Sequence, residues 1–200
     1  MPRVHPRVGS EINSLNMKFL LTSLREATHA SHNSLDAAFG ALDLQSRLDY
    51  ARFLRGHAIG MASLYPAFSR FVTTELKQPC PNYLDMLALD LADLGEQISQ
   101  LPSVSVPDNL SNPAVAYVVS GSRLGLAVIR RNGYWGREHG LLSRYMEDEQ
   151  GLAIWKEVSA WLKACEVDEH RASLEGDVAV AAFEIFREAF HASTLAPAPN

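Results

Sequence analysis

Apolar side chains recur every three or four residues along most of this chain, which is the period of an α-helix. The clearest case is the segment 21–39, in which six side chains share one face: Leu21, Leu24, Thr28, His32, Leu35 and Phe39. No stretch alternates apolar and polar residues for long enough to predict a sheet. The sequence therefore predicts an all-α fold, and it places His32 on the inward face of the first helix.

The helical segments predicted from this period are 16–39, 48–77, 84–94, 114–132, 138–147, 151–164 and 174–192. Asn16 is the expected N-cap of the first segment and Gly40 its C-cap. Gly133 is expected to close the helix that starts near residue 114. Pro66 predicts a kink or a break within the second segment.

A chain of 200 residues has the size of one domain and can bury a stable core without disulfides or a structural metal. Cys80 and Cys165 have no partners at metal-ligand spacing, and we interpret both as packing residues. Residues 1–16 are predicted to be a flexible arm, 17–193 a single helical domain and 194–200 a frayed tail.

The charge balance argues against nucleic acid and against an anionic membrane as the main partner. Lys and Arg number 18 against 23 Asp and Glu, which gives a formal net charge of −5. No apolar run has the length of a transmembrane helix, and residues 1–16 lack the apolar centre of a signal peptide. We therefore predict a cytoplasmic protein that binds a small ligand.

Two glycines, Gly121 and Gly125, stand one turn apart in the apolar segment 114–132. Each costs roughly 1 kcal/mol relative to alanine in a helix, so we expect something to lie against this helix. Two interpretations of these glycines stay open. Either the helix backbone approaches a flat ligand closely, or it packs tightly against another helix. Ser122 is placed to donate either to water beside a ligand or to the backbone carbonyl four residues earlier.

His32 is a candidate metal ligand, because neutral imidazole frequently binds iron and haem iron in particular. Asp36 lies one turn later, where its carboxylate can accept the second ring N–H and fix the tautomer. The alternative is a core histidine hydrogen-bonded to its neighbour. With His29, the pair also matches the composition of a two-histidine, one-carboxylate iron site, although a boundary position is the favoured interpretation of His29.

Glu188 and His191 form one Glu-x-x-His unit in the last predicted helix. Ferritin-like di-iron bundles need two such units and two further carboxylates, and this sequence has no second unit. We interpret these two residues as part of a solvated helix face.

Two segments together resemble the signature segments of haem oxygenases, in particular the bacterial branch that produces biliverdin. They are Leu24-Arg25-Glu-Ala-Thr28-His-Ala-Ser-His32 and Tyr117-Val-Val-Ser-Gly121-Ser122-Arg-Leu-Gly125, and their order and separation also agree. A weaker likeness covers nearly everything after residue 17, including 90–95, the helix of Trp155 and the stretch from Ala181 to Phe186.

The resemblance implies a haem oxygenase-like helical bundle in which haem lies between the first helix and a kinked helix that contains the glycines. It makes His32 the axial ligand of the iron. The distal, catalytic positions are then Gly121, Ser122 and Gly125. The remaining haem contacts implied are Arg25 and Tyr117 near the propionates, together with Thr28 and Phe186.

The activity implied is cleavage of haem, as both cofactor and substrate, to biliverdin, carbon monoxide and ferrous iron. It uses O2 and electrons from an external reductase or ferredoxin, and a bilin-binding photoreceptor is one acceptor that would suit the product. The chain departs from many relatives at Ser120, Ser122 and Leu126. These departures leave open the proton network and the meso carbon that is cut.

Two alternatives to this enzyme remain open at the level of sequence. One is a protein that binds or transfers haem without turnover, and the other is a haem-independent di-iron oxidase of related helical architecture. The residues do not identify the electron donor, the oligomeric state or the biological role, whether iron acquisition or bilin supply.

Overall fold

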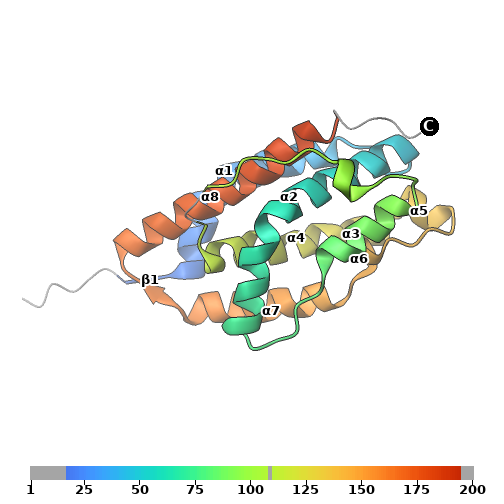
Figure 1. The fold of residues 1–200 in the computed structure, drawn as a ribbon. Helices are drawn as coiled ribbons and strands as arrows, with labels where there is room; N and C mark the ends of the chain where they lie inside the picture. Colours follow the sequence, from blue (N-terminus) through green and yellow to red (C-terminus); the bar gives the residue numbers. More distant parts are fainter. Residues whose placement is uncertain (1–16, 108–109, 195–200) are drawn as a thin grey trace, which may run out of the picture.

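The computed structural model describes residues 17–107 and 110–194, which are almost entirely helical (Figure 1). The predicted all-α class is therefore confirmed. The predicted arm, the expected N-cap Asn16 and the tail from residue 195 lie outside the described residues. The elements in chain order are β1 (Lys18–Phe19), α1 (Leu20–Gly40), α2 (Arg47–Thr74), α3 (Tyr83–Ala92), one turn of 3-10 helix (Ile98–Gln100), α4 (Asn112–Asn132), α5 (Trp135–Glu138), α6 (Arg144–Glu147), α7 (Gln150–Ala164), β2 (Glu166–Val167) and α8 (Glu169–Ala192).

The helices form a bundle with α2 and α4 in its middle. In Figure 1, α1 and α8 run side by side along one flank, and α7 lies along the opposite flank. The other main packing contacts join α2 to α8, α2 to α4 and α4 to α7. This arrangement brings α1 and α4, which carry the two motifs, to either side of one region of the bundle.

The first helix begins later than predicted. Lys18 and Phe19 are extended and pair antiparallel with Val167 and Glu166, so α1 starts at Leu20 rather than at residue 16. The prediction missed this pairing because a two-residue strand carries no alternating pattern. The helix also includes Gly40, and its C-cap is Ala41 instead of the predicted glycine.

Other boundaries follow from local capping and turns. The last helix starts at Glu169, earlier than predicted, because the Asp168 side chain accepts a hydrogen bond from the Arg171 amide at 2.8 Å. The predicted helix 138–147 is instead two single turns, α5 and α6, on either side of Gly140 with its φ of 77°. Gly133 ends α4 with a φ of 88°, as expected for a C-terminal glycine.

The second helix is continuous through Pro66, so the break that was one of the two expected outcomes does not occur. Figure 1 shows that α2 changes direction along its length. Cys80 and Cys165 are free, half-buried and packed against the core, as expected. Within the two described ranges, no helix is long and apolar enough to cross a membrane.

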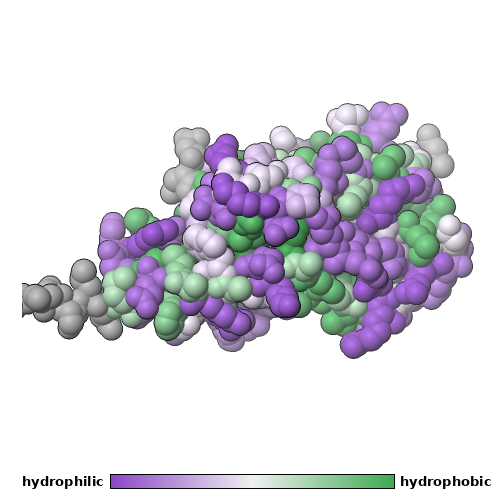
Figure 2. All heavy atoms as spheres, turned by 90° about the horizontal axis from the view of Figure 1, so that it is seen from below, coloured by the Kyte–Doolittle hydropathy of each residue, from purple (hydrophilic) through white to green (hydrophobic). Residues whose placement is uncertain are grey.

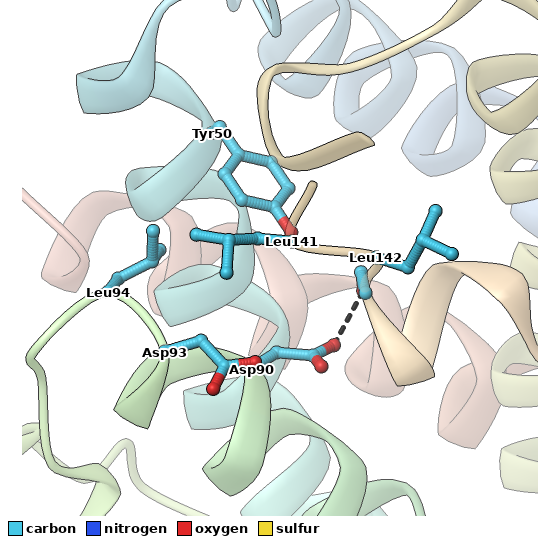
Figure 3. Close-up of a pocket in the computed structure, with 7 residues that line it drawn as sticks. Tyr50, Asp90, Asp93, Leu94, Leu141 and Leu142 are labelled. Atoms are coloured by element: carbon cyan, nitrogen blue, oxygen red, sulfur yellow. Dashed lines mark hydrogen bonds between the residues drawn. The ribbon is translucent and has the colours of Figure 1, made fainter. Parts of the chain in front are cut away.

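A buried carboxylate fixes the corner between α3 and α6 (Figure 3). Asp90 accepts hydrogen bonds from Ser143 Oγ at 2.5 Å and from the Arg144 and Tyr145 amides at 2.8 and 3.0 Å. Around it, Tyr50 and Leu141 close a small pocket. Because Tyr145 follows directly in α6, this anchor sets the position of a tyrosine that lies behind the functional site.

Candidate functional site

Burial of α1 ends halfway along the helix, and burial of α4 becomes discontinuous in its second half. The stripe predicted for α1 is buried up to Thr28 and becomes accessible from His32 onward. In α4 the run from Ala114 to Ser120 is buried, and burial becomes incomplete at Gly121. An amphipathic helix normally covers its apolar stripe with a partner, so the loss of burial on both helices marks a cavity between them.

A cavity of about 800 Å³ occupies this place, within the usual range for small-molecule and cofactor sites. Its walls come from α1, α2, α4, α7 and α8, and they are mostly apolar, with several aromatic rings. Figure 2 shows hydrophobic side chains gathered in a recess between hydrophilic ones on one face of the molecule. The polar side chains that line the cavity are Arg25, His32, Asp36, His57, Tyr117, Ser122 and Asn132.

The predicted pair on α1 is formed. Nδ1 of His32 lies 3.0 Å from a carboxylate oxygen of Asp36. Because a carboxylate only accepts, this contact places the proton on Nδ1 and leaves the lone pair of Nε2 free for a ligand. The side chain of His32 is 53% exposed, so the core-histidine alternative is wrong, and its expected inward face is in fact the wall of an open cavity.

The other histidine-based sites weighed from the sequence are not assembled. His29 is exposed, as its favoured interpretation predicted. Glu188 and His191 are also exposed on α8. No group of three or more His, Cys, Asp or Glu that could hold a metal ion is present in residues 17–107 and 110–194.

The two glycines of α4 face open space or a single ring. A Cβ added at Gly125 would meet no atom within 4 Å, so tight helix packing is the wrong interpretation of this glycine. At Gly121 the nearest neighbour is the Trp155 ring of α7, at 3.6 Å, which is ordinary van der Waals contact. Ser122 donates to the Val119 carbonyl at 2.8 Å, so its hydroxyl takes the backbone option.

One end of the cavity is polar, and it lies beside the N-terminal halves of α1 and α4. Arg25 and Tyr117 both line it. Thr28 does not line the cavity and is buried one layer behind, where its hydroxyl donates to the Leu24 carbonyl at 2.7 Å and lies 3.3 Å from the Tyr117 hydroxyl. Its position suits it to hold Tyr117 in place rather than to contact a ligand.

The cavity is elongated along α1 and α4. Arg25 and Tyr117 mark one end, whereas Gly40 and Gly133, which lie at the C-terminal ends of α1 and α4, mark the other. His32 lies between these ends. The arrangement suits a flat, largely apolar ligand that carries anionic groups at one end.

A second histidine in the cavity, His57 of α2, was missed by the sequence analysis. Its side chain is buried, and Nδ1 lies 3.0 Å from the Phe53 carbonyl. Burial, with a smaller contribution from the positive charge of Arg123, lowers the pKa of His57 to about 4. Its position in the stripe Phe53, His57, Gly60 and Leu64 is the signal that could have revealed it.

His57 makes the stability of the fold depend on pH. The pKa is 6.5 for an ordinary imidazole and about 4 in the folded protein, so the unfolded chain takes up a proton first as the pH falls. We expect the free energy of unfolding to decrease by about 3 kcal/mol from this group between pH 7 and pH 4. Urea denaturation of the wild type and of His57→Phe at both pH values measures the difference.

The exposed His29 supplies the matched control for this prediction. His29→Gln, a substitution at an exposed position of α1, should keep the wild-type pH dependence. An equally steep loss of stability in His57→Phe would show that other groups cause it.

Two glycines of α2 seat the aromatic rings at the cavity floor. A Cβ at Gly56 would lie 3.4 Å from the Phe39 ring, and a Cβ at Gly60 would lie 2.5 Å from Cδ1 of Phe186. The second distance is too short for any side chain. Phe186, one of the expected ligand contacts, is buried and lines the cavity. The depth of the cavity therefore depends on Gly60.

Gly60→Ala should push the Phe186 ring into the cavity and weaken ligand binding about tenfold, at a cost typical of an overpacked core. Absorption titration with haemin measures the affinity. Gly56→Ala is the matched control on the same helix, because Gly56 does not line the cavity and a Cβ there would lie no closer than 3.4 Å to the Phe39 ring. Equal affinities of the two variants would contradict this role of Gly60.

No protein-family model matches the chain, and a search of curated proteins finds no significant match.

Proposed function

We propose that this chain binds haem in the cavity between α1 and α4 and cleaves it, with oxygen and external electrons, to biliverdin, carbon monoxide and ferrous iron. The observation that carries the proposal is convergence on one cavity. Every site residue expected from the resemblance except Thr28 lines it, namely Arg25, His32, Tyr117, Gly121, Ser122, Gly125 and Phe186.

The chemistry of the lining residues fits haem. His32 offers an imidazole nitrogen whose tautomer is fixed by Asp36. Gly125 leaves open space above the opposite wall, where a side chain would collide with a flat ligand. Arg25 is exposed at the polar end and forms no ion pair with another described residue, so its guanidinium is free to bind a carboxylate.

Each of these residues then has a defined task. A bound haem supplies the iron that activates oxygen, and it is also the substrate that is opened. His32 would hold the iron of a bound haem, and Asp36 keeps the imidazole oriented. The α4 wall, formed by backbone at Gly121 and Gly125, would leave room for a flat ligand and restrict the space beside it.

A haem carrier without turnover is the second candidate, and one observation favours it. The Ser122 hydroxyl donates to the Val119 carbonyl, so this donor is not directed at the cavity. An enzyme needs a source of protons near the reacting atoms, whereas a carrier does not. Turnover, and not binding, separates the two candidates.

The experiment is a haemin titration of the purified protein, followed by addition of an electron donor in air with catalase present. Stoichiometric growth of a Soret band, its bleaching on reduction and the rise of a biliverdin band are the expected results. A Soret band that persists with several donors, ferredoxin and its reductase included, would favour the carrier. Failure to bind haemin would refute both, and metal analysis would then test the di-iron alternative.

A further inference from the structure

Behind the cavity floor, three buried polar atoms have no hydrogen-bond partner among the described residues. They are the hydroxyls of Tyr83 and Tyr145 and Nη1 of Arg123. Both tyrosines are completely buried and Arg123 is 2% exposed. The guanidinium lies 4.6 Å from the centre of each tyrosine ring, and the two rings meet edge to face at 5.5 Å, so the three groups form one cluster. Buried polar groups are nearly always paired with protein or with an ordered water molecule.

His57 is the member of this cluster that faces the cavity. Its ring centre lies 5.5 Å from that of Tyr145. Because the Phe53 carbonyl only accepts, the 3.0 Å contact fixes the proton on Nδ1, and Nε2 carries a lone pair. No side chain or backbone group in the described ranges donates a hydrogen bond to that nitrogen. The cavity floor thus presents an acceptor, and the neighbouring Tyr145 ring carries a hydroxyl with no partner among the described residues.

Ser122 does not fill this role. Its hydroxyl proton points to the Val119 carbonyl, and Ser120 makes the same kind of contact to the Ala116 carbonyl at 2.5 Å. Around the floor, the other neighbours of His57 are the apolar rings of Phe39, Phe53 and Phe186. Of the groups with unused hydrogen-bonding capacity here, His57 lines the cavity, and Tyr145 is the one whose ring contacts the imidazole.

We propose that His57 and Tyr145 together bind one water molecule at the cavity floor, and that His57 acts through it as a positioning residue for the ligand. The water accepts the Tyr145 hydroxyl proton and donates one proton to Nε2 of His57. Its second O–H then faces the cavity. An otherwise aromatic floor in this way gains one oriented hydrogen-bond donor, which favours ligands with an acceptor atom at that point.

The water site can be tested in the ligand-free protein, so the test does not depend on haem binding. Long-range proton–nitrogen spectra of the full chain labelled with ¹⁵N-histidine report the tautomer of each imidazole, and the signal lost in His57→Gln identifies His57. We expect Nδ1 protonated and Nε2 unprotonated at pH 7, with cross-relaxation between water and the Tyr145 hydroxyl. A tautomer protonated at Nε2 would overturn the proposal.

Tyr145→Phe removes only the hydroxyl and should shift the Nε2 resonance of His57. Tyr65→Phe is the matched control, because the Tyr65 hydroxyl donates to the Pro81 carbonyl instead. An Nε2 resonance that is the same in Tyr145→Phe as in the wild type would show that the two groups do not share a water molecule, and would overturn the proposal.

The positioning role rests on the proposed function and has its own measurement. In His57→Phe we expect kcat to fall about tenfold, the loss of roughly one hydrogen bond, with a smaller loss of affinity for haemin. His57→Gln, which keeps an acceptor oxygen, should recover part of kcat. An unchanged kcat in His57→Phe would overturn the positioning role while leaving the water site to the spectra.

Discussion

Replacement of His32 by alanine is expected to lower haem-dependent turnover by more than about a hundredfold. Loss of a group that only orients a metal ligand typically costs 10- to 100-fold, and His32 is the proposed ligand itself. Its imidazole makes one polar contact, to Asp36, and 53% of the side chain is accessible, so the substitution should leave the fold intact. Bilin formation and the Soret band of the haemin complex are the measurements.

Added imidazole makes this test specific. It should enter the space left in His32→Ala and restore the Soret band and part of the turnover, since the cavity is open at this point. His29→Ala is the matched control on the same helix and should behave like the wild type. Full activity of His32→Ala without imidazole would refute the axial role.

The helical class could be predicted from periodicity alone, because each long helix buries a stripe whose spacing is visible in the sequence. Boundaries set by a single local contact were less accessible. The start of α8 depends on the Asp168 cap, and the start of α1 depends on a two-residue strand pair with Glu166 and Val167. The second of these is a contact between distant segments, which no local pattern encodes.

The site could be predicted in part for the same reason. His32 and Gly125 could be singled out because His32 is a polar residue on an apolar helix face and Gly125 is a residue that is unfavourable inside a helix. The cavity explains both, since a ligand space replaces the partner that such a face would normally bury. Thr28 followed the same stripe but lies behind Tyr117, because the helix face turns from core to cavity between Thr28 and His32.

The polar cluster behind the floor could not be predicted in this way. Arg123 stands next to Ser122 in the motif and has the appearance of an ordinary charged residue, yet it is 2% exposed and lies against both Tyr83 and Tyr145. These residues come from α4, α3 and α6, which meet only in the folded chain. The carboxylate of Asp90 brings Tyr145 to this cluster.

Asp90→Ala is accordingly the substitution expected to cost the most stability, about 3 kcal/mol, because it leaves the buried Ser143 hydroxyl and two backbone amides without their acceptor. Denaturant unfolding at pH 7 measures the loss. Asp93→Asn is the matched control on the same helix, since the Asp93–Arg144 pair is exposed and should contribute within about 0.5 kcal/mol.

Asp90→Ala should also change the surroundings of His57 in the cavity, because α6 loses the contacts that hold Tyr145 against the imidazole. Under conditions where the variant is still folded, we expect the ¹⁵N resonances of the His57 ring to shift, whereas those of His32, on α1, stay at their wild-type positions. Asp93→Asn should change neither set. A destabilised Asp90→Ala with an unchanged His57 spectrum would mean that packing against Tyr83, Arg123 and His57 is enough to fix Tyr145, and that the carboxylate contributes to stability alone.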